Sequence, residues 1–297
     1  FDKVNMRDDL GAVCFTGSSE VFDNIYRDVG NRVHSRTNYT RLIGETGGKN
    51  FHFVDTSCEN MIDYVVEKTI ESAFNYSGQK CSAASRVYIP DNLWGEVRAN
   101  LVSILKRIKM GSPENFTNFI NAVIDKKSFE KITKYIDGVK KSSDAEIILG
   151  GNYDDSRGYF IEPTVVLTSN PSHEMMCEEI FGPVVSVYVY PKDKFDETLK
   201  LVDESSSYAL TGAIFSKDRY AIERSSDFLK YAAGNFYIND KPTGAVVGQQ
   251  PFGGARGSGT NDKAGAQMNL LRWVSARTIK ETFLEVTDYN YPFLDSE

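Results

Sequence analysis

The sequence predicts an α/β fold built around a largely parallel sheet. Short segments rich in Val, Ile, Phe and Tyr alternate along most of the chain with longer amphipathic stretches, which is the pattern of strands interleaved with helices. With 297 residues, the chain can bury roughly three quarters of its unfolded surface, enough for one large domain or two unequal ones.

The composition argues against several classes of protein. The formal net charge of -7 and the scattered basic residues argue against nucleic acid as a partner. No apolar run approaches the roughly 18 residues that a membrane span needs, so we expect a soluble protein. The four cysteines lack C-x-x-C spacing, which predicts neither a metal site nor a disulfide scaffold and favours a reducing compartment.

The first half of the chain predicts where the most informative cysteine lies. Residues 11–26 predict a strand, a turn with helix caps at 17–20 and the start of a helix. Residues 56–59 have capping-box spacing, and apolar side chains then follow one helical face until Gly78 ends the helix. Cys81 is therefore expected just beyond a helix end.

The same alternation continues to residue 238. We predict strands over 86–89, 146–149, 183–190, 210–215 and 235–238, and helices over 93–108, 129–139, 195–202 and 221–231. Residues 243–266 are glycine-rich and predict a loop, with a flexible surface linker as the alternative. Residues 270–283 are β-like and predict a terminal strand or arm.

Cys81 has the setting of a nucleophile. It lies in a polar, glycine-broken turn between a lysine and a serine, which can expose a thiol and lower its pKa. A free cysteine is also commonly a small buried hydrophobe, and the local context leaves both interpretations open. For Cys14, Cys58 and Cys177 we expect the buried, inert role.

Glu45 precedes the pair Gly47 and Gly48, which lets the backbone turn closely beneath a side chain. A single glutamate is usually just solvated, so Glu45 alone carries little weight. Together with Cys81 it suggests an enzyme, because a thiolate can form a covalent adduct with a carbonyl and a carboxylate can activate the water that releases the product.

Longer segments around these residues resemble one family. Residues 44–50, Gly-Glu-Thr-Gly-Gly-Lys-Asn, resemble the glutamate signature of the NAD(P)-dependent aldehyde dehydrogenases, and residues 74–83 resemble their cysteine signature. Residues 15–18 look like the family's cofactor loop, and residues 178–184 look like the segment that holds the nicotinamide ribose. The similarity runs from about residue 11 to the C-terminus and corresponds to the C-terminal part of the family's full length.

The resemblance implies catalytic roles for Cys81, which attacks an aldehyde, and for Glu45, which activates the water that hydrolyses the thioester. The family stabilises the oxyanion with the N–H of the nucleophile and an upstream Asn side chain, and this sequence has no counterpart of that Asn. The cofactor is implied to be NAD, with NAD rather than NADP inferred from the subgroup. The implied cofactor-binding residues are Gly17, Ser18, Ser19, Glu20, Val21, Glu179 and Phe181. An ordinary capped turn and a solvated carboxylate are the alternatives.

Within the family, residues 48–54, 235–240 and 247–256 look most like the members that oxidise L-glutamate γ-semialdehyde to L-glutamate in proline catabolism. Such a substrate needs donors for its carboxylate, and charge-assisted hydrogen bonds can outweigh diffuse repulsion from a negatively charged chain. The residues implied to hold it are Ser82, Gly244, Ala245 and Phe252. Ala245 stands where relatives often carry Ser, which removes one hydroxyl and leaves the backbone donor.

The resemblance also implies an organisation. Residues 1–46 correspond to the C-terminal part of a Rossmann-like NAD-binding domain, 47–256 to the catalytic domain, and 257–297 to an oligomerisation arm that adds to a neighbouring subunit's sheet. A homo-oligomer, a dimer or higher, and a location in the mitochondrial matrix are implied. Two alternatives stay open: an aldehyde dehydrogenase with another substrate range, and a non-catalytic binding or assembly fragment.

Overall fold

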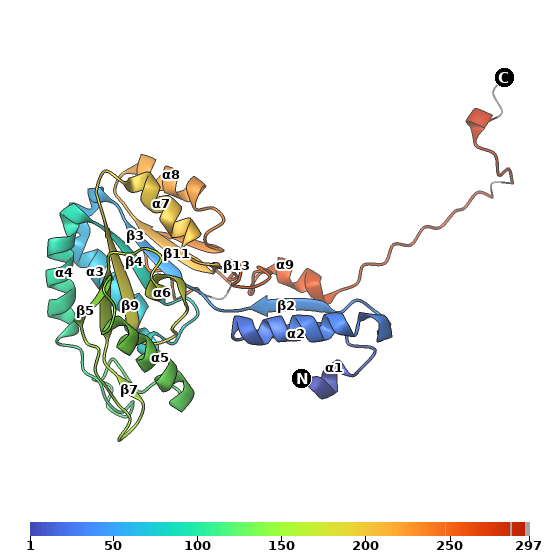
Figure 1. The fold of residues 1–297 in the computed structure, drawn as a ribbon. Helices are drawn as coiled ribbons and strands as arrows, with labels where there is room; N and C mark the ends of the chain where they lie inside the picture. The colour runs from blue at the N-terminus through green and yellow to red at the C-terminus, as the bar shows by residue number, and fades with distance from the viewer. Residues whose placement is uncertain (247, 286, 295–297) are drawn as a thin grey trace.

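A seven-stranded sheet forms the centre of the protein (Figure 1). The computed structural model describes residues 1–246, 248–285 and 287–294; the remaining positions, which fall in the predicted loop and arm, lie outside the described residues. In order across the sheet, the strands are β12 (Asn235–Ile238), β11 (Thr211–Phe215), β3 (Asn50–Val54), β4 (Ala84–Pro90), β9 (Val184–Tyr190), β8 (Thr164–Thr168) and β5 (Ala145–Leu149). Only β5 is antiparallel to its neighbour among these described strands, so the predicted α/β class with a largely parallel sheet is confirmed.

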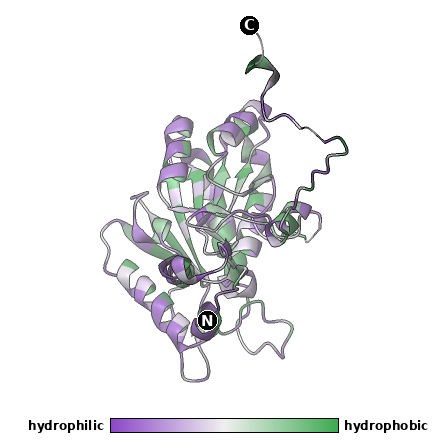
Figure 2. Ribbon diagram, turned by 90° about the vertical axis from the view of Figure 1, so that its right-hand side faces the viewer, coloured by the Kyte–Doolittle hydropathy of each residue, from purple (hydrophilic) through white to green (hydrophobic). Residues whose placement is uncertain are grey.

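Helices cover both faces of this sheet. Helices α3 (Ile62–Phe74) and α4 (Asp91–Leu105) pack on one face, and α5 (Lys126–Val139), α7 (Phe195–Glu204) and α8 (Arg219–Phe228) pack on the other. Alternation along β9 explains the two cores, because Val185 and Val187 join α3 and α4 whereas Val184 joins α5. Figure 2 shows largely hydrophobic strands enclosed by helices with hydrophilic outer turns.

Short elements connect these layers. They are α6 (Glu174–Cys177), β6 (Tyr153–Asp154), β7 (Phe160–Ile161), β10 (Tyr208–Ala209) and β13 (Ala255–Arg256). β13 pairs with β10 in an antiparallel ribbon, which returns the chain from the large sheet toward the N-terminal unit.

A smaller unit is built from the first 46 residues (Figure 1). After the short α1 (Asp2–Asn5), strand β1 (Ala12–Thr16) pairs in parallel with β2 (Arg41–Glu45), and α2 (Ser19–Asn31) packs on them through Phe22, Ile25 and Val29. Cys58 is buried as expected, but Cys14 on β1 is exposed, so its predicted burial is wrong. β1 is an edge strand of a two-stranded sheet, and its Cys14 side is not covered by the described residues.

Most predicted elements are present with shifted ends, and two expectations are wrong. Residues 56–59 form a 3-10 turn capped by Asp55 instead of a capping box on α3. Residues 270–283, predicted as a terminal strand or arm, follow α9 (Gln267–Leu270) with a 3-10 turn (Leu271–Trp273) and chain that has no strand partner among the described residues, so the strand alternative is wrong. A strand needs a hydrogen-bonding neighbour, and Figure 1 shows this segment running away from the body.

Core packing predicts different effects for two phenylalanines. Phe74, at the end of α3, is fully buried, whereas Phe116 is 98% exposed. We expect Phe74→Ala to lower the free energy of unfolding by about 3–5 kcal/mol, because it removes a large buried side chain and leaves a cavity. The matched Phe116→Ala change should stay within about 0.5 kcal/mol in chemical denaturation. Equal losses for the two variants would contradict this packing.

Candidate active site

A cavity of about 570 Å³ lies where the two units meet. It brings together seven of the residues named from the sequence: Gly17, Ser18, Glu45, Cys81, Glu179, Phe181 and Phe252. Six others do not line it: Ser19, Glu20, Val21, Ser82, Gly244 and Ala245. Thr46, Gly47, Ser128, Lys131 and Ala264 line it without having been singled out as site residues.

The positions of the strand ends explain this convergence. Cys81 precedes β4 and Glu179 precedes β9, so both lie at the amino edge of the parallel sheet. Glu45 is the last residue of β2, and four residues separate it from the start of β3. The link between the two units therefore passes directly through the site.

Glycine and left-handed backbone shape the turn before Cys81. Tyr76, Ser77 and Gly78 have φ of 56°, 57° and 68°, a region that non-glycine residues rarely adopt. A Cβ added to Gly78 would collide with the carbonyl oxygen of Gly182. The hydroxyl of Ser77 secures the turn, donating to the carbonyl of Asn121 at 2.8 Å.

The amide of Asn50 anchors the other side of this turn. Its Nδ2 donates to the carbonyl oxygens of Cys81 at 2.7 Å and Ala83 at 2.8 Å, while its Oδ1 accepts the N–H of Thr211. A Cβ added to Gly48 would lie 2.5 Å from the Cys81 carbonyl oxygen, so glycine is required there. Asn50 thus fixes the backbone of Cys81 against two strands of the sheet.

Glu45 is a half-buried carboxylate. Burial raises its pKa to about 7, and the positive charge of Lys263 opposes that shift. The ammonium of Lys263 is held by the carbonyls of Gly234 and Gly253. The buried Oε2 of Glu45 has no hydrogen-bond partner among the described residues, which leaves one oxygen available for a water or substrate.

Glu179 lies against the glycine pair that follows Glu45. Its Oε1 accepts the N–H of Gly48 at 2.9 Å, and a Cβ on Gly47 would collide with its other oxygen. Lys131 on α5 donates to the Glu179 carbonyl at 2.7 Å. Burial raises the pKa of Glu179, against this N–H and nearby lysine charges.

Burial and nearby negative charge keep the thiol of Cys81 protonated at rest, so the lowered pKa suggested by its sequence context is wrong. Burial raises its pKa first, and the negative charges of Glu179 and Glu45 raise it further. A group with a pKa near 7 can accept a proton near neutral pH, and Glu45 has that value in the same cavity. The arrangement can activate the sulfur by proton transfer instead of by a neighbouring cation.

The cavity residues at the start of α2, together with Glu179 and Phe181, can hold a dinucleotide. The 13-residue α2 is capped by Ser18, whose Oγ accepts the N–H of Val21, and helix N-termini favour phosphate. The Glu179 carboxylate can accept ribose hydroxyls, and the 40% exposed ring of Phe181 offers a flat apolar surface. Ser19 is not free for this role, since its hydroxyl donates to the carbonyl of Gly257.

Ser82 faces a different neighbour. Its Oγ lies 2.7 Å from the Oγ1 of Thr243, which begins the segment with Gly244 (φ 86°) and Ala245. No hydrogen-bond acceptor for the N–H groups of Gly244 and Ala245 is found in the part of the chain that the structure describes. Ser82 directly follows Cys81 in the sequence, and its contact with Thr243 brings the segment that carries these amides beside the Cys81 turn.

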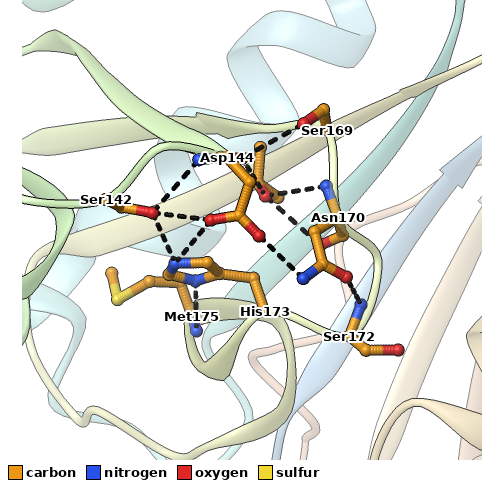
Figure 3. A network of polar contacts seen from close by, with 8 residues as sticks. Ser142, Asp144, Ser169, Asn170, Ser172, His173 and Met175 are labelled. Carbon is orange, nitrogen blue, oxygen red and sulfur yellow. Dashed lines mark hydrogen bonds and ion pairs between the residues drawn. The ribbon is translucent and has the colours of Figure 1, made fainter.

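A second polar cluster resembles a hydrolase triad but lacks its geometry (Figure 3). The Nδ1 of His173 accepts the N–H of Met175, so its proton lies on Nε2. The Ser142 hydroxyl donates to Asp144 at 2.6 Å, and the imidazole cannot take that proton. None of these residues lines the cavity, and we assign the cluster a structural role.

Other chemistry has no support in the described ranges. No three His, Cys, Asp or Glu residues there converge as metal ligands. His52 is buried between Thr69 and Ser72, and burial lowers its pKa to about 3. No described helix has both the length and the apolar character that crossing a membrane requires.

The chain belongs to the aldehyde dehydrogenase family, whose model matches residues 2–279. Among curated proteins it is similar to the mitochondrial Delta-1-pyrroline-5-carboxylate dehydrogenases of Dictyostelium discoideum, at 55% identity over 94% of this chain, and of Homo sapiens, at 49% over 99%. Among solved structures it is similar to the Delta-pyrroline-5-carboxylate dehydrogenase from Mycobacterium tuberculosis bound with NAD. That match has a TM-score of 0.90 and 44% identity, and covers 99% of this chain and 53% of that one.

The chain spans about half the length of these relatives, covering 50% of the Dictyostelium protein and 52% of the human one. The aldehyde dehydrogenase fold expected from the sequence is confirmed by the family match and the structural similarity.

Removing the amide of Asn50 should loosen the Cys81 turn. We expect Asn50→Leu to lower the free energy of unfolding by about 2 kcal/mol or more, since it leaves buried carbonyls without donors. It should also change the rate at which a disulfide reagent labels Cys81, because the backbone support of that residue is lost. Asn92→Leu, at an exposed position of α4, is the matched control. If Asn50→Leu behaves like the control, Asn50 does not anchor the turn.

Proposed function

We propose that this chain is the catalytic part of an NAD-dependent L-glutamate γ-semialdehyde dehydrogenase, which forms L-glutamate in proline catabolism. The single observation that carries the proposal is that Cys81 and Glu45 line the same cavity as Glu179 and Phe181. The names of the similar proteins, at 48–55% identity in three curated matches, support the choice of substrate.

The first half of the reaction belongs to Cys81. Glu45 takes the thiol proton, directly or through a water, and the sulfur then bonds to the aldehyde carbon. The resulting alkoxide is stabilised by donors such as the N–H of Cys81. As the alkoxide collapses, its C–H bond breaks with the electron pair leaving as hydride, and a thioester remains on the sulfur. Bound NAD supplies the hydride acceptor.

The second half belongs to Glu45. Glu45 first releases the thiol proton to solvent. Its unpartnered Oε2 then accepts a proton from a water, the water oxygen bonds to the thioester carbon, and the C–S bond breaks. The carboxylic acid leaves, and the sulfur regains a proton.

Cofactor binding is assigned to one wall of the cavity. In this assignment Gly17 and Ser18 face the pyrophosphate at the start of α2, Glu179 binds the ribose hydroxyls and Phe181 packs beside the ring. The cavity lining and the buried carboxylate of Glu179 support it. Glu20 and Val21, which are exposed, contribute through the helix start and not through their side chains.

Substrate binding is assigned to the donors beyond Cys81. The carboxylate of the semialdehyde meets the N–H groups of Gly244 and Ala245 and the hydroxyl of Ser82, and Phe252 packs against the aliphatic stem. The unoccupied backbone donors support this, together with the position of Phe252 in the cavity.

The protein works as a homo-oligomer in this proposal, with residues 1–46, 47–256 and 257–297 acting as cofactor, catalytic and oligomerisation parts. Residues beyond α9 support this, since Val274, Ile279 and Phe283 are more than half exposed and have no strand partner in the described part of the chain. The edge strand β12 of another copy would provide one. The word mitochondrial in the names of similar proteins supports a location in the mitochondrial matrix.

Replacing the two reacting residues should separate the two half-reactions. In an active enzyme that contains this sequence, we expect Cys81→Ala to abolish NADH formation, because no thioester can form. Glu45→Gln should still form one equivalent of NADH, more slowly because Cys81 loses its base, and should slow later turnover by about 10²–10⁴-fold because water is no longer activated. Stopped-flow absorbance measures both. NADH formation by the Cys81→Ala protein would end this proposal, and equal activity with simple aliphatic aldehydes would end the choice of substrate.

The pKa of Glu45 predicts the pH profile of hydrolysis. The active base is the carboxylate, and its pKa is raised to about 7, so protonation removes the base as the pH falls below 7. We expect deacylation to slow about tenfold per pH unit below pH 7 and to level off above it. Single-turnover hydrolysis of the acyl-enzyme measures this rate. A profile that stays flat from pH 5 to 8 would contradict the role of Glu45.

A further inference from the structure

The hydroxyls of Ser82 and Thr243 form a buried pair that links the Cys81 turn to the segment before Gly244. Their oxygens lie 2.7 Å apart, and the two residues are 7% and 4% exposed. We propose that Thr243 is a positioning residue that directs the Ser82 hydroxyl toward a substrate carboxylate and so selects anionic aldehydes. This inference rests on the proposed function and adds a specificity determinant to it.

The number of protons in the hydroxyl pair explains why an anionic aldehyde is preferred. Two hydroxyls carry two protons, and their mutual hydrogen bond uses one of them. Either oxygen can be the donor within the pair. An anion beside Ser82 favours the arrangement in which the Thr243 hydroxyl donates to Ser82 Oγ. Only then is the Ser82 proton free to be donated to the anion. Hydrogen bonds to charged groups are stronger than neutral ones, and a chain of donors polarises each member.

Ion pairs hold the Thr243 segment against the helix that leads to Cys81. Lys241 Nζ lies 2.7 Å from Glu71 Oε1, and Lys68 Nζ lies 3.8 Å from Asp240 Oδ1. Glu71 and Lys68 are both on α3, whose end opens the Cys81 turn. One helix therefore supports both partners of the hydroxyl pair, which keeps their spacing fixed.

The charged cluster beside the Thr243 segment carries one more positive than negative charge. This cluster holds three lysines and two carboxylates: Lys68, Lys80, Lys241, Glu71 and Asp240. Lys80 lies close enough to Lys241 for the two positive charges to interact, and Glu71 offsets them only in part. A carboxylate bound at Gly244 and Ala245 would bring the missing negative charge. An aldehyde without a carboxylate gains no attraction from these positive charges.

Thr243→Val tests the proposal because valine keeps the shape of threonine and removes only the hydroxyl. In an active enzyme that contains this sequence, we measure kcat/KM for L-glutamate γ-semialdehyde and for propanal. We expect the ratio of the two to fall about tenfold, mainly through a higher KM for the semialdehyde. Thr243→Ser, which keeps the hydroxyl, should restore the ratio to within about twofold. The rate of Cys81 labelling by a disulfide reagent checks that the turn stays intact.

The outcomes are distinguishable. An unchanged ratio in Thr243→Val, or an equal loss for both aldehydes with altered Cys81 labelling, overturns the role of Thr243 and leaves the proposed function standing. If the unmodified enzyme itself shows no preference for the semialdehyde, the proposed substrate fails and this inference fails with it. If Thr243→Val lowers kcat/KM only for the semialdehyde and Thr243→Ser restores it, the result supports both the proposed substrate and the role of Thr243.

Discussion

The hydrogen bonds from the Asn50 amide to the Cys81 turn are the interaction on which the site depends most. Asn50 begins β3, and through Cys81, Ala83 and Thr211 it joins the chain before β4 to β11. Gly48 lets the backbone approach closely enough for this to happen. The same short stretch links Glu45 on β2 to the large sheet. Cys81 and Glu45 are therefore both positioned by the continuous backbone of residues 45–50.

Burial gives this site its chemistry. It raises the pKa of Glu45 to about 7, raises the pKa of Glu179 and Cys81, and lowers the pKa of Lys49 to about 7. The Nζ of Lys49 has no hydrogen-bond partner among the described residues. Glu45 and Lys49 therefore titrate near neutral pH, where proton transfer to or from Glu45 costs little. Burial therefore sets the acid–base behaviour of these groups.

Much of the architecture was predictable because the spacing of apolar residues and the local composition determine it. Amphipathic α5 and α7 and apolar β9 follow the expected patterns. β3 was missed because it is buried on both faces and shows no alternation. The predicted strand over 270–283 failed because β-propensity cannot form a ladder without a neighbour, and Cys14 is exposed because strand burial depends on what covers the strand.

The site was predictable to a different degree. The signature segments named seven residues that the fold gathers around one cavity, but they could not reveal the partners of those residues. Asn50 lies 161 positions from Thr211, and Ser82 lies 161 positions from Thr243. Such contacts leave no mark in a single sequence, since no local pattern requires either partner. Lys263 beside Glu45 was hidden for the same reason.

The central claim is that the Cys81 sulfur carries the acyl group during turnover. Rapid acid quenching of the active enzyme during turnover of semialdehyde and NAD, followed by peptide mass spectrometry, tests it directly. The account predicts a glutamyl mass increment on the peptide that contains Cys81, formed only when NAD is present. An acyl group on another residue, or full turnover without any covalent adduct, would contradict it.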